Sequence, residues 1–115
     1  MKTFKERRRH ERYKVQNRST VLTYPTLNLS DSVLDVSVAG LSFTYIGWEK
    51  WPQEEIKVDI LDREYFFENI PAHVISDIQL NEKSKSLRRC SVAFGLLDKD
   101  QKDNLRHYIE SVATH

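Results

Sequence analysis

Short runs in which apolar and polar residues alternate occupy most of the chain between Tyr13 and Gly95. An alternation of period two puts one row of side chains in a core and the next row in solvent, so it predicts half-buried β-strands. Glycines, prolines and polar turn residues separate the runs, which is typical of an antiparallel barrel or sandwich of six or seven short strands. The runs cover residues 13–16, 20–24, 27–30, 32–37, 41–46, 56–61, 64–68, 72–78 and 88–95.

The period changes near the end of the chain. Apolar residues there recur every three or four positions, which predicts one face of a helix from about residue 99 to 112. Asp98 and Gln101 have the spacing of a capping box at the start of this helix. A lone helix of this length is marginal in water, so its apolar stripe must pack against the strands. The stripe consists of Leu105, Tyr108, Ile109 and Val112.

Length and composition describe a single domain. The 115 residues are 39% hydrophobic and 30% charged, which fits one globular core and argues against disorder throughout the chain. No apolar run approaches the length of a membrane span, and no apolar segment follows the basic N-terminus as it would in a secretory signal. The single Cys90 has no partner for an intramolecular disulfide. These features favour a cytoplasmic protein without a membrane span.

Positive charge is concentrated at the N-terminus. The first 18 residues contain eight Lys or Arg and two Glu, a net charge of +6, and because the whole chain carries +1 the remainder carries −5. Residues 1–12 show no periodic apolar pattern, so we expect a flexible basic arm that captures an anionic partner. Arginine predominates in this arm, and its planar fork can bond phosphate or guanine through two parallel hydrogen bonds. A solvated basic tail is the alternative.

The chain offers little for catalysis. Its four histidines are dispersed without the spacing of a zinc site, and three glycines are too few for a phosphate-binding loop. A nucleophile pair of Cys90 and His73 remains open, although the alternation around Cys90 marks it as a small core residue. We therefore expect no enzymatic activity, no metal and no cofactor.

Two short motifs carry the remaining chemical signal. The first is Arg8-x-x-x-Arg12 in the arm, and the second is Asp35-x-Ser37-x-x-Gly40. Residues two apart on a strand share a face, so the carboxylate and the hydroxyl would lie on one rim together with exposed backbone N–H groups. Gly40 supplies either a positive φ or room for a close backbone approach. Taken alone, the second motif is explained better by an Asx or Ser turn at the end of a strand.

Together the two motifs are complementary to a guanine nucleotide. The Watson–Crick edge of guanine presents N–H donors that suit a carboxylate, whereas its O6 and N7 acceptors suit an arginine fork. The phosphates of such a ligand would also find arginine partners in the arm.

The two motifs, the strand-like segments after them, Val92-Ala93-Phe94-Gly95 and the terminal amphipathic helix resemble the PilZ domain family over essentially the whole chain. The resemblance implies a mainly β fold. We expect from it a six-stranded antiparallel barrel over residues 13–115 with a C-terminal helix, preceded by a ligand-binding arm over residues 1–12. PilZ domains serve as bacterial receptors for the second messenger cyclic di-GMP, so the resemblance implies a nucleotide-sensing module.

The resemblance also implies roles for the motif residues. Arg8 and Arg12 would grip guanine edges and phosphates from the arm. Asp35, Ser37 and Gly40 would hold a guanine against the surface of the barrel.

Arg7 directly precedes the first motif arginine. In PilZ domains an arginine at this place goes with a self-intercalated ligand dimer, so the resemblance implies that Arg7 contacts a second cyclic di-GMP molecule. Arg9 and His10 fall at variable positions of the motif and receive no role.

The leading hypothesis is a cyclic di-GMP receptor whose arm becomes ordered on binding and relays the signal to a downstream protein. The ligand must then bind the ordered state better than the free one. A ligand-independent PilZ adaptor is the first alternative. A nucleic-acid-binding barrel is the second and weaker one, because the net charge of −5 on the body leaves no basic track for a strand.

Overall fold

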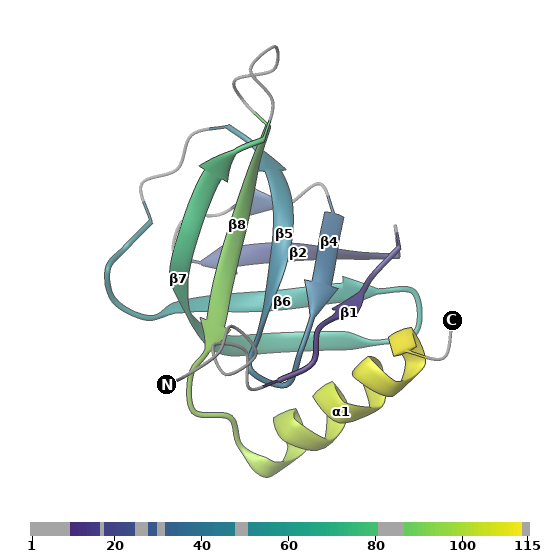
Figure 1. Cartoon of the computed structure of the whole chain (residues 1–115). Coiled ribbons are helices and arrows are strands. Elements are labelled where there is room, and N and C mark those ends of the chain that lie inside the picture. Colours follow the sequence, from purple (N-terminus) through teal and green to yellow (C-terminus); the bar gives the residue numbers. More distant parts are fainter. Residues whose placement is uncertain are drawn as a thin grey trace, which may run out of the picture.

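The computed structural model describes residues 10–16, 18–24, 28–29, 32–47, 51–80 and 87–113, and for residues 28–29 it describes the backbone. Within these ranges the chain forms eight β-strands followed by one helix (Figure 1). The strands are β1 (Tyr13–Lys14), β2 (Ser19–Tyr24), β3 (Asn28–Leu29), β4 (Ser32–Val36), β5 (Gly40–Ile46), β6 (Ile56–Asp62), β7 (Phe66–Gln79) and β8 (Leu87–Phe94), and the helix is α1 (Lys99–Ala113).

All eight strands belong to one antiparallel sheet with the order β1-β4-β5-β8-β7-β6-β2-β3. The predicted class, mainly β with a C-terminal helix, is confirmed. The strand count differs from the expected six because β1 and β3, each two residues long, add to the two edges of the sheet. The sheet curls on itself, and no pairing within the described ranges joins β1 to β3.

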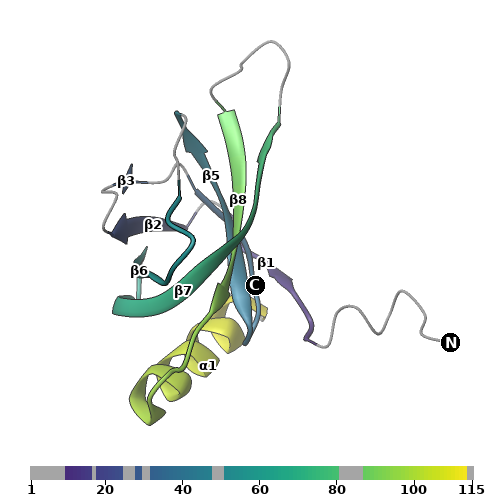
Figure 2. The same cartoon turned by 90° about the vertical axis from the view of Figure 1, so that its left-hand side faces the viewer.

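Strand β7 connects the two halves of the curled sheet. Its first half pairs with β6 and its second half pairs with β8, and Ala72 is paired on both sides, with Ile56 and with Phe94. Figure 1 shows the result: β2 and β6 run across, behind the upright β4, β5 and β8, and β7 bends from one direction into the other. Figure 2 shows the same curl from the side.

The sequence predicted two separate strands, 64–68 and 72–78, where the structure has the single strand β7. Pro71 lies inside this strand next to the residue at which β7 changes partners. A proline cannot donate to a neighbouring strand, but its carbonyl still accepts the Gly95 N–H at 2.7 Å. The turn predicted at Asp62 and Arg63 is confirmed, with the Asp62 N–H donating to the Tyr65 carbonyl at 2.9 Å.

The core lies between the two halves of the sheet and is closed at one end by α1. Burial alternates along β2 and β8, as the period-two pattern of the sequence predicts, whereas six consecutive residues of β5 are buried. The apolar residues with no exposed surface are Val21, Val36, Leu41, Tyr45, Val58, Ile60, Ala72, Cys90 and Tyr108.

The helix begins with the predicted capping box. The Asp98 carboxylate accepts the Gln101 N–H at 2.7 Å, and the Gln101 side chain accepts the Asp98 N–H at 3.0 Å. The predicted stripe is buried, and the Tyr108 ring packs edge-on against Phe67 with the ring centroids 5.4 Å apart. This helix, the only one in the ranges given above, is not long and apolar enough to cross a membrane.

A buried ion pair ties the helix to the barrel. Arg18 donates from Nε and Nη2 to the two carboxylate oxygens of Asp62, at 2.8 and 2.9 Å. The same Nη2 donates to the Ser111 hydroxyl on α1 at 2.9 Å. The two charged side chains are 8% and 0% exposed, so α1 covers a pair that solvent hardly reaches.

The environment of Asp62 sets its protonation. Burial alone would raise the pKa of this carboxyl. Hydrogen bonds from Arg18, the Ser19 hydroxyl and the Glu64 N–H outweigh burial and hold the pKa well below its usual range. The carboxylate is therefore charged whenever the native state is populated near neutral pH.

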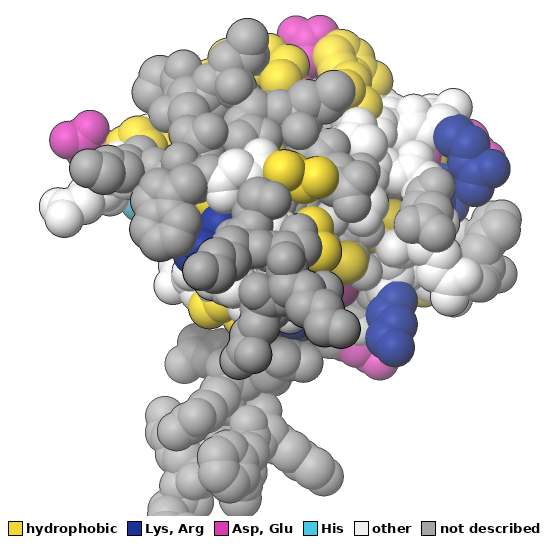
Figure 3. Space-filling view, turned by 90° about the horizontal axis from the view of Figure 1, so that it is seen from above, with side chains coloured by type: hydrophobic (Ala, Val, Ile, Leu, Met, Phe, Trp, Pro, Cys, Tyr) yellow, Lys and Arg dark blue, Asp and Glu magenta, His cyan; other side chains and the backbone are white. Residues whose placement is uncertain are grey.

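The end of the barrel opposite α1 carries an aromatic cluster. The rings of Tyr45 and Trp51 meet edge-on with centroids 5.5 Å apart, and Trp51 donates to Asp77 at 2.8 Å. Figure 3 looks onto this end, where hydrophobic side chains appear in small patches between polar ones. Trp51 thus caps the core, whereas Trp48 lies outside the described residues.

Candidate functional site

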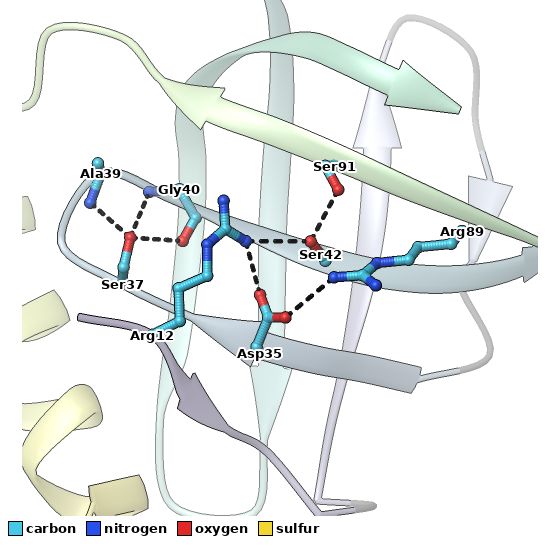
Figure 4. A network of polar contacts seen from close by, with 8 residues as sticks. All are labelled: Arg12, Asp35, Ser37, Ala39, Gly40, Ser42, Arg89 and Ser91. Atoms are coloured by element: carbon cyan, nitrogen blue, oxygen red, sulfur yellow. Dashed lines mark hydrogen bonds and ion pairs between the residues drawn. The ribbon is translucent and has the colours of Figure 1, made fainter. Parts of the chain in front are cut away.

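The edge strand β1 brings the two sequence motifs together. Tyr13 is paired with Val36 and Lys14 with Asp35, so Arg12 enters directly beside the second motif. Arg12 Nη1 donates to Asp35 Oδ1 at 2.9 Å and to the Ser42 hydroxyl at 3.4 Å (Figure 4). The side chains of Arg12 and Asp35 are 26% and 16% exposed, so the ion pair lies at the surface.

A second arginine reaches the same carboxylate from the other side. Arg89 on β8 donates from Nη2 to Asp35 Oδ2 at 3.2 Å. Strand β5 lies between β4 and β8, and the hydroxyls of its Ser42 and of Ser91 on β8 are 2.8 Å apart. Figure 4 shows Asp35 between the two guanidinium groups, with this pair of serines alongside. The site is thus a carboxylate held by two cations above a floor of small side chains.

Both arginines keep donors to spare. Within the part of the chain that the structure describes, Arg12 forms hydrogen bonds through Nη1, which leaves Nε and Nη2 available. Arg89 Nε is buried and has no hydrogen-bond partner among these residues. An acceptor that enters beside Asp35 would therefore meet unused N–H groups of Arg12, which stays charged because arginine does not lose its proton in proteins.

Ser37 shapes the turn between β4 and β5. Its hydroxyl accepts the N–H groups of Ala39 and Gly40 at 3.0 and 3.2 Å, and its own N–H donates to the Gly40 carbonyl at 2.8 Å. Strand β4 ends at Val36, so Ser37 leaves the face on which Asp35 projects and is 3% exposed. The Ser-turn interpretation of the motif is the one the structure shows. The expectation of free backbone N–H groups is wrong for Ala39 and Gly40.

Gly40 is required by a close approach of two backbones. A Cβ at this position would lie 2.1 Å from the backbone carbonyl oxygen of Val92 on β8, far inside contact distance. The φ angle of Gly40 is not positive; among the described glycines, Gly47 has the positive φ. Of the two roles that the sequence left open for Gly40, the close approach is the correct one.

The proposed nucleophile pair does not form. Cys90 faces the core and is completely buried, and burial together with the charge of Asp77 raises the pKa of its thiol to about 12. His73 is paired with Ala93, three residues along β8 from Cys90, so the two side chains lie on opposite faces of the sheet. In the described ranges no three His, Cys, Asp or Glu side chains gather as they would to hold a metal ion.

Comparison with known proteins agrees with this arrangement. A sequence model described as the PilZ domain matches residues 6–111. The chain belongs to the PilZ domain family. A comparison with curated protein sequences gives no match.

Solved structures share the fold of this PilZ domain at low sequence identity. The PilZ domain of YcgR from Escherichia coli, solved with c-di-GMP, has a TM-score of 0.70 and 17% identity, covering 92% of this chain and 91% of the other. A MrkH–c-di-GMP complex from K. pneumonia has a TM-score of 0.73 and 17% identity, covering 90% and 51%. The Bacillus subtilis inhibitor of motility MotI/DgrA has a TM-score of 0.67 and 16% identity, covering 91% and 50%. The chain thus spans about half of the last two proteins.

The structure of this PilZ domain places four of the six residues that the sequence singled out. Arg12 and Asp35 are in contact, whereas Ser37 and Gly40 form the adjacent turn. Arg7 and Arg8, like most of the predicted arm, lie outside the described residues.

Sequence reasoning missed three residues of the PilZ site: Arg89, Ser42 and Ser91. The alternation in 88–95 does place Arg89 and Ser91 together on the face opposite Cys90, and a charged residue in the middle of such a strand is a usable signal. What the sequence lacks is the strand order. The sequence does not indicate that β8 lies beside β5, because the residues in contact, Ser42 and Ser91, are 49 positions apart in the chain.

Proposed function

We propose that this PilZ domain is a receptor for cyclic di-GMP. The observation that carries the proposal is the meeting of Arg12 and Asp35 at 2.9 Å, beside a turn closed by Ser37 and Gly40. A carboxylate and a guanidinium with unused N–H groups match the two edges of guanine, which presents donors on one side and acceptors on the other. Two solved structures that share this fold, those of YcgR and MrkH, contain c-di-GMP.

The contributions of the site residues follow from the geometry. Asp35 would accept N–H groups of the guanine Watson–Crick edge, and Arg12 would bond its O6 and N7 or a phosphate. Ser37 would act mainly by holding the turn, because its hydroxyl is already engaged. Gly40 would let the turn lie flat against β8.

The arm would supply the remaining contacts. Arg8 would bind a phosphate or guanine edge, and Arg7 would contact a second nucleotide stacked on the first. Ordering these residues has an entropic cost, so the bound arm forms only where the new hydrogen bonds and stacking exceed it. The ordered arm would present the changed surface to a downstream protein.

Isothermal titration calorimetry with the full chain tests the proposal. We expect binding of cyclic di-GMP with two nucleotides per chain, and one per chain in Arg7→Ala. Cyclic di-AMP is the matched control ligand, because it carries the same ribose–phosphate ring with adenines. It should bind at least tenfold more weakly. The melting temperature should rise with cyclic di-GMP, since a ligand that binds only the native state stabilises it by mass action.

Two results would contradict the proposal. The first is the absence of both binding heat and a rise in melting temperature at millimolar cyclic di-GMP. That result would favour a ligand-independent adaptor. Equal affinity for the two cyclic dinucleotides, with a steep loss in salt, would instead indicate general binding of nucleotide phosphates by the basic arm.

A further inference from the structure

An apolar groove lies beside the Ser37–Gly40 turn, between the end of β8 and the helix. Its volume is about 430 Å³, and its lining comes from the turn, from the segment that joins β8 to α1, and from α1 itself. Figure 1 shows these three parts meeting at the lower end of the barrel. Leu97 and Leu105, which are nearly buried, form part of the lining.

Two large apolar side chains stand open to solvent along this groove. Val38 is 51% exposed and Leu96 is 91% exposed, although the next residue, Leu97, packs into the core. Burial of an exposed leucine side chain removes apolar surface from water and is therefore stabilising. A nearly fully exposed leucine next to an apolar groove therefore offers a partner a large gain at no structural cost to the barrel.

The charged side chains that line the groove are of one sign. Lys102 and Arg106 lie one helical turn apart on α1 and are the charged residues of the lining. Arg106 also donates to Asp103 at 2.8 Å, but Asp103 is not part of the lining. A partner with acidic side chains beside its apolar ones would complement this surface.

The same charges argue against two other occupants. Residues 1–9 of this chain contain five Lys or Arg and one Glu, a net charge of +4, and would be repelled by Lys102 and Arg106. A second copy that docked groove to groove would bring two pairs of cations face to face, because a two-fold interface presents the same patch on both sides.

We propose that the groove docks an acidic amphipathic segment of a partner protein, with apolar residues of the segment seated on Val38 and Leu96 and its carboxylates on Lys102 and Arg106. A short helix with apolar anchors on one face and Asp or Glu at its sides fits such a groove. The interface is small, so the complex is expected to be weak and reversible.

The docking site and the nucleotide site share one structural element. Val38 and Ala39 line the groove and lie between Ser37 and Gly40 of the motif. The Ala39 carbonyl also accepts the Phe94 N–H at 2.8 Å, so a shift of the turn moves the groove wall with it. Coupling between the two sites rests on the proposed function. Such coupling is reciprocal: if the nucleotide changes the affinity for the partner, the partner changes the affinity for the nucleotide by the same factor.

A peptide-display selection on the full chain without nucleotide tests the docking. We expect the recovered peptides to combine Leu, Ile or Phe with Asp or Glu. Leu96→Asp should weaken their binding at least tenfold, whereas Ile46→Asp should leave it within twofold. Ile46 is the matched control because it is 65% exposed and lies at the other end of β5. Both substitutions are at exposed positions, so circular dichroism should show both variants to be folded.

Charge reversal gives a second, independent measurement. Lys102→Glu should weaken binding of the acidic peptides at least tenfold. It should strengthen binding of a version of the same peptide that carries Lys in place of Asp and Glu. The proposal would be overturned if the selection recovered basic peptides, or if Leu96→Asp bound the acidic peptides as tightly as the original chain does. It would also be overturned if sedimentation showed a dimer that Leu96→Asp dissociates. Peptide affinity is then measured with cyclic di-GMP added, so a failure of nucleotide binding is separate from a failure of docking.

Discussion

The guanidinium of Arg12 lies 2.9 Å from the carboxylate of Asp35, so the two motifs of the sequence meet in one ion pair. Arg89 contacts the other oxygen of the same carboxylate, so Asp35 has two cationic partners. A carboxylate with a single cationic partner would lose its whole ion-pair stabilisation if that partner moved away. In the proposed receptor, the second arginine would allow Arg12 to leave Asp35 for the nucleotide.

Replacing Arg12 by alanine should weaken cyclic di-GMP binding by about 1–3 kcal/mol, the range for a bidentate arginine–guanine contact. The free energy of unfolding should change by less than about 1 kcal/mol, because the ion pair is partly exposed. Calorimetry and urea denaturation measure the two quantities. Arg63→Ala, an exposed arginine of the β6–β7 turn, is the matched control for general loss of charge. Unchanged nucleotide affinity in Arg12→Ala would remove Arg12 from the site.

Replacing Gly40 by alanine should destabilise the fold by about 1–3 kcal/mol, the usual range for overpacking. The added methyl group would meet the Val92 carbonyl at 2.1 Å, and β5 and β8 would have to separate. Gly95→Ala is the control, since a Cβ there first meets the flexible Glu55 side chain at 3.1 Å. Urea denaturation should show the larger loss for Gly40→Ala. A loss equal to that of Gly95→Ala would contradict the close approach.

The buried pair of Arg18 and Asp62 predicts a specific acid sensitivity. The pKa of Asp62 is lowered in the native state, so its contribution to stability is present above the unfolded value of 3.8 and is lost as the pH falls below it. In Asp62→Asn, Arg18 loses its buried partner, which should reduce the free energy of unfolding by about 3–5 kcal/mol at neutral pH. The variant should also lose part of the acid dependence that the original chain shows as the pH falls from about 4 to about 2. Urea denaturation across this pH range measures both effects, and an unchanged pH profile would contradict them.

Removal of the helix cap should have a smaller effect. Asp98→Ala should lower the free energy of unfolding by about 1 kcal/mol, because the Gln101 N–H loses its acceptor. Asp100→Ala is the control, since Asp100 lies in the first turn but its effect is limited to the helix dipole, about 0.3–1 kcal/mol. Thermal denaturation of the two variants should place Asp98→Ala at the lower melting temperature. The reverse order would show that the cap contributes little.

The sequence predicted those features that depend on local pattern. The capping box, the buried stripe of α1 and most strands follow from spacing alone, and the structure confirms them. Strand β7 was divided wrongly because Pro71 normally marks a boundary. Here the bend of the sheet accommodates it, and a bend of that kind depends on partners from both sides.

The site was predictable only in part for the same reason. Arg12, Asp35, Ser37 and Gly40 belong to motifs that are visible in the linear chain. Arg89 enters the site because β8 pairs with β5, and that pairing is decided by the packing of the whole barrel. Motifs therefore locate residues that are close in sequence, whereas residues contributed across strands need the fold.

The contact between Gly40 and β8 affects how related sequences are read. A glycine at this position is needed for the barrel to close its backbone hydrogen bonds, whatever the protein binds. A homologue that no longer binds the ligand would still need a glycine at this position. The glycine of the D-x-S-x-x-G signature is accordingly weaker evidence of nucleotide recognition than the aspartate, whose carboxylate lies at the surface beside Arg12.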